Sequence, residues 1–182
     1  MKKQIAIILC MSYAIIALQS QILVGLSAKW NDDFSEWLIL TDDEAIEGDL
    51  RMTWPMQRDW SSFDYRIEEA SGNIKIKWRN NPNEWETRGD NHIITARTRW
   101  KDDPREWRIT NNDFTLLLKS KWGNNPNVWI LTDEKYGYFE MRMYNRDDFR
   151  EWEIIDELDD AIPLAMKMTM VFLVMYHSTP RL

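Results

Sequence analysis

The chain has 182 residues, about the size of one domain, and 44% of them are hydrophobic, enough to supply a core. The 29% charged residues indicate a polar surface. The formal net charge is −7, and no basic tail or run of Lys and Arg is present, which argues against a nucleic-acid partner. The single cysteine, Cys10, lies near the N-terminus, so the rest of the chain cannot form a disulfide.

The first 20 residues have the pattern of a secretory signal peptide. Two lysines precede an apolar run over residues 5–18, and cleavage is expected near residue 20. The run is short for a membrane span, which needs about 20 residues. We therefore expect an exported protein (periplasmic, envelope-associated or secreted) with residues 21–182 as its domain. Membrane anchoring by an uncleaved N-terminal segment is the alternative.

A phrase with two tryptophans recurs along the next part of the chain. It reads KWRNNPNEWE at residues 77–86, RWKDDPREWR at 99–108 and KWGNNPNVWI at 121–130. Such an internal period predicts one repeated structural unit. At intervals of 22 to 26 residues, the second aromatic of the six copies is Trp37, Phe63, Trp85, Trp107, Trp129 and Trp152. The first aromatic is Trp30, Trp54, Trp78, Trp100 and Trp122, with Met143 in its place in the last copy.

Polar and apolar residues alternate on both sides of each phrase. Ile74, Ile76 and Trp78 share one face, and Lys75 and Lys77 share the other. A period of two with one apolar face is typical of a half-buried β-strand. The Asn-Pro and Asp-Pro pairs inside the phrases favour turns. Each unit is therefore predicted to be a hairpin, and six units give about twelve antiparallel strands.

Twelve strands with one apolar face must either close or stack. Six hairpins would make only three propeller blades, and an open meander would expose its apolar face. We therefore expect a mainly β fold, an antiparallel up-and-down barrel of about twelve strands over residues 21–156. Because side chains already fill a barrel of eight strands, a barrel of twelve would have a hole to fill.

The C-terminal segment is expected to fill this hole. Residues 161–177, AIPLAMKMTMVFLVMYH, are apolar on nearly every side, as in a helix that is buried all round. The sequence therefore predicts a central helix over residues 160–177, capped by Asp159 or Asp160. A buried strand over residues 168–176 is the alternative.

Both aromatics of each hairpin flank the same turn, so all six pairs should gather at one end of the barrel. Their register with Ile74, Ile76 and Leu118 puts them on the apolar face, and we expect both to point inward and brace the turn against the core. The alternative is an exposed aromatic surface that stacks on sugar rings, as in a carbohydrate-binding module, or sits in a membrane interface.

A basic row on the outward strand face is the best candidate for a ligand-binding surface. Its positively charged side chains point to an anionic lipid or polysaccharide as ligand. A solvated, edge-protecting strand face is the alternative. The candidate residues of this basic band are Lys75, Lys77, Arg97, Arg99, Lys119, Lys121 and Arg142.

No catalytic site is expected. The two histidines, His92 and His177, lack metal-ligand spacing, and no nucleophile elbow or phosphate-binding loop is present. Turn chemistry explains the paired acids, since the glycine-containing loop of a calcium site is absent. These pairs are Asp32-Asp33, Asp102-Asp103 and Asp147-Asp148. We expect a non-enzymatic scaffold or binding domain without metal or cofactor, or else a purely structural or protein-partner domain.

The pattern resembles the tubby-like superfamily, within it the LURP-one-related and phospholipid-scramblase branch. The resemblance lies in LLLKSKWGNNPNVWILTDE, in the last hairpin FEMRMYNRDDFREWEIIDE, and in the segment DDAIPLAMKMTMVFLVMY that follows it. It covers about residues 21–182. It implies a twelve-stranded barrel closed around a hydrophobic C-terminal helix. Because tubby proteins bind phosphoinositide headgroups through a basic pocket, it also implies an anionic lipid as a ligand class.

Overall fold

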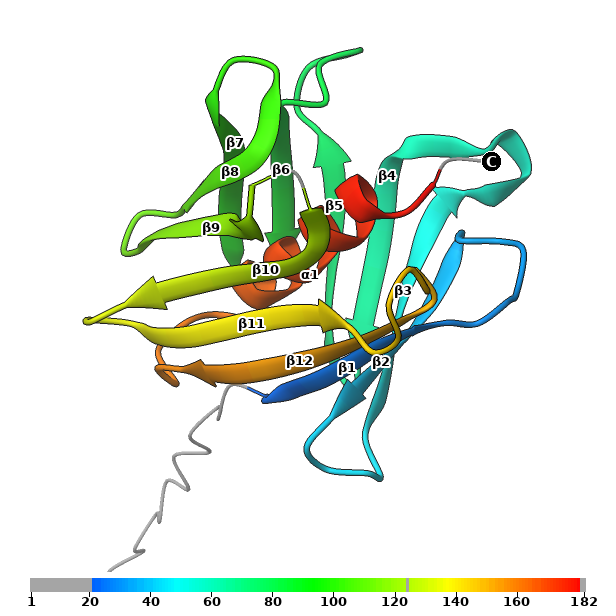
Figure 1. Cartoon of the computed structure of the whole chain (residues 1–182), viewed down its shortest axis with the longest axis horizontal. Coiled ribbons are helices and arrows are strands. Elements are labelled where there is room, and N and C mark those ends of the chain that lie inside the picture. Colours follow the sequence, from blue (N-terminus) through cyan, green and yellow to red (C-terminus); the bar gives the residue numbers. More distant parts are fainter. Residues whose placement is uncertain (1–20, 124, 181–182) are drawn as a thin grey trace, which may run out of the picture.

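The computed structural model describes residues 21–123 and 125–180 and shows a closed antiparallel barrel of twelve strands around one helix (Figure 1). Each strand pairs with its neighbours in the chain, and β1 closes the barrel against β12. The strands are β1 (Leu23–Ala28), β2 (Glu36–Thr41), β3 (Glu47–Trp54), β4 (Asp59–Ile67), β5 (Ala70–Ile76), β6 (Glu84–Gly89), β7 (His92–Trp100), β8 (Asp103–Thr110), β9 (Thr115–Trp122), β10 (Asn125–Asp133), β11 (Gly137–Met143) and β12 (Glu151–Leu158). A short 3₁₀ helix, η1 (Pro55–Gln57), joins β3 to β4.

This architecture confirms the predicted barrel. The expected hairpins are the pairs β1–β2, β3–β4, β5–β6, β7–β8, β9–β10 and β11–β12, one for each copy of the repeat. Because the barrel runs up and down, the turns inside these hairpins all lie at one end, which we call the turn end. The signal peptide predicted over residues 1–20 lies outside the described residues.

The predicted central helix is also confirmed, as α1 (Leu164–Ser178), although it begins four residues later than predicted, and the alternative strand is wrong. Every side chain of α1 is buried except that of His177, which is partly exposed. The predicted cap is wrong, because the N-cap residue is Pro163, with no side-chain cap bond. Asp159 instead accepts a hydrogen bond from the amide of Ala161 in the loop before the helix (Oδ1 to N, 2.8 Å).

The second aromatic of each repeat points into the barrel, and several of these side chains pack against α1. Trp85 lies 4.7 Å from both Phe172 and Tyr176 between ring centroids, and Phe63 lies 5.2 Å from Phe172. Edge-on and tilted aromatic contacts of this kind add about 0.5–1.5 kcal/mol each beyond the burial of their area. The helix therefore meets a wall of aromatic side chains that the repeat supplies.

A buried indole N–H needs an acceptor, and the repeat provides the same one each time. Nε1 of the inner tryptophan donates to the carbonyl oxygen of the residue three positions earlier, at 2.8–3.0 Å. The second copy has Phe63 at this position, which carries no N–H. The five bonded pairs are Trp37 with Phe34, Trp85 with Pro82, Trp107 with Pro104, Trp129 with Pro126, and Trp152 with Phe149.

The paired Asn and Asp residues of the turns have two separate structural roles, which confirms the turn-chemistry interpretation. The first residue adopts a left-handed conformation in three pairs, at Asn80 (φ 62°), Asp102 (φ 58°) and Asp147 (φ 64°), and Asn and Asp tolerate it best after glycine. The second accepts a hydrogen bond from the amide two residues later, as Asp103 does from Arg105 (3.1 Å). The same bond is made by Asp33, Asn81, Asn125 and Asp148 in the other pairs, and by Asp59, which follows Arg58.

Candidate functional site

The first aromatic of each repeat lies outside the barrel, which corrects the prediction that both aromatics point inward. These side chains keep 53–64% of their surface exposed, whereas the inner aromatics are at most 3% exposed. Together with the exposed Tyr144 they form what we call the outer aromatic rim, with one member from each hairpin. The rim consists of Trp30, Trp54, Trp78, Trp100, Trp122 and Tyr144.

The inward position is lost because the strand ends before or at the first aromatic. In the third hairpin β5 stops at Ile76, and the chain enters a turn in which Trp78 O accepts from Asn81 N (2.9 Å). The indole then folds onto the outer wall, where Trp78 Nε1 donates to Glu84 Oε2 (3.1 Å). Trp30 makes the same bond to Glu36 (3.1 Å).

The last hairpin differs from the predicted alignment. Met143, which was expected in the place of the first aromatic, is an inward residue opposite Trp152. The residue after it, Tyr144, is 69% exposed and is the aromatic that this hairpin contributes to the rim.

Cations hold several rim tryptophans against the wall. A basic group lies over the ring of the following tryptophan for Lys29 and Trp30 (5.7 Å to the centroid), and likewise for Arg99 with Trp100 (5.5 Å) and Lys121 with Trp122 (5.7 Å). Members of adjacent hairpins are separated by two strand spacings, about 10–12 Å around the barrel. The rim therefore presents aromatic faces, already partly fixed in position, at regular intervals.

The turns beyond the rim are polar and charged. The exposed residues that follow rim members include Arg79, Lys101, Asp102 and Asp147. Lowering this end into a bilayer would bury these charges without partners, at a large cost. Hydroxyl-rich ligands, by contrast, can use the carboxylate, amide and guanidinium groups as acceptors and donors.

Hollows lie between adjacent turns at this end, and their sizes differ. The hollow between the β7–β8 and β9–β10 turns has a volume of about 480 Å³, and we call it the β8–β9 notch. The hollow between the β11–β12 and β1–β2 turns measures about 390 Å³, and the one between the β1–β2 and β3–β4 turns about 110 Å³.

The basic band lies on the outer wall as predicted, but part of it is paired with acids. Lys77 contacts Glu84 (2.8 Å) and Arg99 contacts Glu106 (3.3 Å). Lys121 pairs with Glu140 (3.0 Å), and Arg142 contacts both Glu153 (2.8 Å) and Glu140 (3.7 Å).

Glu140 is the most buried acid of these pairs. Burial alone would raise its pKa, but the hydrogen bonds from Tyr138 and Lys121 and the charges of Lys121 and Arg142 leave the pKa lower than usual. The hydrogen bond to Glu140 in turn raises the pKa of Tyr138 to about 12. These groups form a closed network of charges on the outer wall.

The remaining three cations of the band, Lys75, Arg97 and Lys119, are exposed and have no ion pair among the described residues. Arg97 lies directly opposite Arg108 in the β7–β8 register. Like charges directly opposite each other destabilise a sheet. Arg108 was not among the predicted site residues, although its position, one residue after an inner tryptophan, was visible in the repeat.

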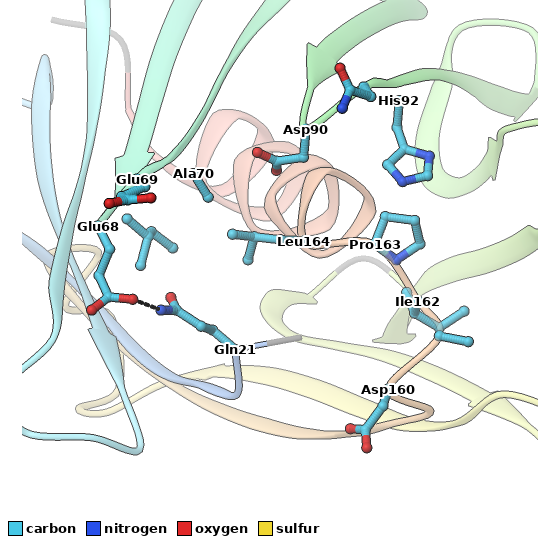
Figure 2. Close-up of a pocket in the computed structure, with 13 residues that line it drawn as sticks. Gln21, Glu68, Glu69, Ala70, Asp90, His92, Asp160, Ile162, Pro163 and Leu164 are labelled. Atoms are coloured by element: carbon cyan, nitrogen blue, oxygen red, sulfur yellow. Dashed lines mark hydrogen bonds between the residues drawn. The ribbon is translucent and has the colours of Figure 1, made fainter. Parts of the chain in front are cut away.

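The opposite end of the barrel has a larger hollow, about 740 Å³, where α1 begins (Figure 2). Its carboxylates come from Glu68, Glu69, Asp90 and Asp160, and His92 also lines it. Figure 2 shows Gln21 bonded to Glu68 (Nε2 to Oε2, 2.8 Å) at its edge. No lysine or arginine lines this hollow, so it offers no complement to an anion.

Within the described ranges, no group of three or more His, Cys, Asp or Glu side chains is placed to hold a metal ion. Among the same residues, no helix is both long and apolar enough to cross a bilayer. Comparisons with protein-family models, with curated proteins and with solved structures gave no match to the chain.

Proposed function

We propose that the chain is a non-enzymatic carbohydrate-binding barrel, in which the outer aromatic rim stacks on the sugar rings of a neutral polysaccharide. The observation that carries the proposal is the separation of the two tryptophan sets. One set is buried and braces the fold, while the other is more than half exposed on every hairpin that carries it. Exposed apolar groups gathered at one end of a protein mark an interaction site.

The energetics favour stacking on sugars as the role of the rim. Covering about 50–100 Å² of apolar indole surface at about 25 cal/mol per Å² contributes about 1–2.5 kcal/mol per site. A contribution of about 1.4 kcal/mol corresponds to a tenfold change in Kd. Two or three tryptophans used together by one polymer would therefore give useful affinity.

The charge balance supports a neutral ligand over an anionic one. The cations next to Trp78 and Trp100 are already paired with Glu84 and Glu106, so they offer little free positive charge. The acidic turn residues would also repel a polyanion. Binding through the rim should therefore depend little on salt, since screening acts mainly on interactions between exposed charges.

Affinity electrophoresis tests this proposal. The protein is run through native gels containing hydroxyethyl cellulose, xylan, mannan or glycol chitin, at low and high salt. We expect retardation by at least one of these, and loss of retardation when Trp30, Trp54, Trp78, Trp100 and Trp122 are all changed to alanine. A control variant with Lys75, Arg97 and Lys119 changed to alanine should still be retarded. If no polysaccharide retards the parent protein, or if the variant without the rim tryptophans is still retarded, the proposal is wrong.

A second candidate rests on the opposed Arg97 and Arg108. An anionic group between them would relieve their repulsion, with Lys119 two strands from Arg97 on the same wall. This candidate predicts binding to heparin or to vesicles with anionic lipid that is lost in high salt. The variant K75A/R97A/K119A should abolish such binding, and the rim variant should retain it.

Kinship with the tubby-like superfamily and export from the cytoplasm are further parts of the proposal. The twelve strands and the buried C-terminal helix support the first. The second rests on the sequence of residues 1–20 alone. Sequencing the N-terminus of the protein recovered from an exported fraction would test it, and a start at residue 1 would count against cleavage.

A further inference from the structure

We infer that the β8–β9 notch is the principal sugar-binding subsite of the rim, so that Trp100 and Trp122 hold consecutive stretches of one glycan while a sugar ring between them occupies the notch. The inference rests on the proposed carbohydrate-binding function and places that function on one side of the barrel.

The notch is the largest of the three hollows described between adjacent turns, at about 480 Å³. A binding site for a small organic group has a few hundred Å³ and joins apolar walls to a few polar groups. The 110 Å³ hollow between the turns that follow Trp30 and Trp54 is too small for this.

Aromatic side chains form the floor of the notch. Trp129 lies there with its Nε1 bound to the carbonyl oxygen of Pro126 (3.0 Å) and to Ser178 Oγ (3.1 Å), so its orientation is fixed. His177 lies beside it and packs on Trp107 at 5.0 Å between ring centroids. This is the place where the end of α1 reaches the turn end, and His177 is the one partly exposed side chain of the helix.

The walls of the notch supply polar groups of fixed orientation. Arg105 forms a two-pronged pair with Asp103, with Nε to Oδ1 at 2.8 Å and Nη2 to Oδ2 at 2.6 Å. The paired side chains present a planar group of donors and acceptors, which suits adjacent hydroxyls of a sugar. On the other wall, a Cβ added to Gly123 would meet no atom within 4 Å, so there is open space at this position.

The two flanking tryptophans are prepared for stacking. Trp100 and Trp122 are 58% and 64% exposed, and each has a cation over its ring. A side chain held in this way loses less conformational freedom when a ligand covers it, which increases the affinity gained.

Isothermal titration with cellohexaose, xylohexaose and chitohexaose tests the inference. The variant W100A/W122A is compared with W30A/W54A, which removes the same side chains beside the smallest hollow. We expect the first to weaken Kd at least tenfold for the hexasaccharide that binds, and the second less than threefold. R105A should weaken Kd at least threefold, and R150A, which removes an equivalent arginine paired with Asp148 in the last hairpin, less than twofold.

The possible results distinguish a sugar site at the notch from sugar binding spread over the whole rim. Equal losses of affinity in the two double variants would overturn the notch as the principal subsite. The carbohydrate-binding function would still stand. Binding that neither double variant weakens would overturn the notch as the principal subsite, and the variant without all five rim tryptophans then decides whether the rim is the binding surface. If none of the three hexasaccharides binds, the notch is not a sugar subsite, and retardation by the polysaccharide gels then decides whether the rim binds sugars at all.

Discussion

Lys167 and Asp156 form an ion pair inside the barrel, with Nζ 2.9 Å from Oδ2 and side chains only 1% and 0% exposed. Lys167 comes from α1 and Asp156 from β12, so the pair joins the plug to the wall. Both groups have further partners: Lys167 Nζ donates to the carbonyl oxygen of Gln21 (3.3 Å), and Asp156 Oδ2 accepts from the amide of Leu23 (3.2 Å). The sequence indicated only that Lys167 interrupts an apolar segment.

Removing one member of this pair should destabilise the protein far more than removing both. K167M leaves Asp156 buried without its counter-charge, and we expect a loss of about 3–5 kcal/mol in the free energy of unfolding. The double variant K167M/D156L should recover most of this loss, because well-packed apolar groups often replace a buried pair without cost. Urea unfolding measures both. A double variant no more stable than K167M would show that the pair is not the reason for the loss.

A charge introduced on the apolar side of α1 should prevent folding. V171D and L173D each bury an extra carboxylate among residues that are 0% exposed, and the buried lysine of α1, Lys167, is already paired with Asp156. The control is I93D, on the outer wall, where the side chain is 56% exposed. Circular dichroism and size-exclusion chromatography should show a folded control and unfolded or aggregated core variants. Normal folding of V171D or L173D would contradict the plugged barrel.

Substitutions of inner and of rim tryptophans should differ in their effect on the stability of the protein. W85F removes the N–H that bonds Pro82 O (2.9 Å) and makes a fully buried side chain smaller, so we expect a loss of about 1–3 kcal/mol. W78F removes an exposed indole and should change stability by no more than about 0.5 kcal/mol. Denaturant unfolding of both variants provides the comparison. Similar losses in the two would mean that the outer tryptophans also support the fold.

Two turn carboxylates should make stability fall in acid. The hydrogen bonds from Arg105 to Asp103 and from Arg150 to Asp148, first from the side chain and then from the amide, lower each pKa to about 2. The folded-state pKa lies below the ordinary 3.8, so this stabilisation is complete above about pH 4 and is lost as the pH falls towards 2.

The matched control for this effect is D103N/D148N, which keeps the side-chain oxygen that accepts from the amide, as Asn81 and Asn125 do in other copies. Unfolding free energies are measured between pH 2 and 5. The difference between parent and variant should shrink as the pH falls. A difference that stays constant with pH would show that these carboxylates do not contribute through their charge.

The fold could be predicted because every repeat gives the same local signals. The alternation around Trp85 fixes which side chains face inward, and six hairpins with one apolar face have to close. The apolar segment that contains Phe172 can then be buried only inside the barrel. Each of these inferences uses residues that are neighbours in sequence or copies of one another.

The site could not be predicted in the same way, because it depends on where each strand stops. Trp78 has the parity of an inward residue, yet β5 ends two residues before it, and alternation has no meaning beyond the last strand residue. A signal was present, because the turn-forming Asn80-Asn81-Pro82 follows so closely that Trp78 has to begin the turn. The ion pair between Lys121 and Glu140, 19 residues apart, has no such local signal.

Acrylamide quenching of tryptophan fluorescence tests whether the rim is the binding surface, and is measured with and without a saturating amount of the polysaccharide that retards the protein in gels. The free protein should contain a readily quenched population, from the rim tryptophans, and a protected one, from the inner tryptophans. Bound polysaccharide should protect the readily quenched population and leave the protected one unchanged. Quenching that is the same with and without the bound polysaccharide would contradict the claim that the rim is the binding surface.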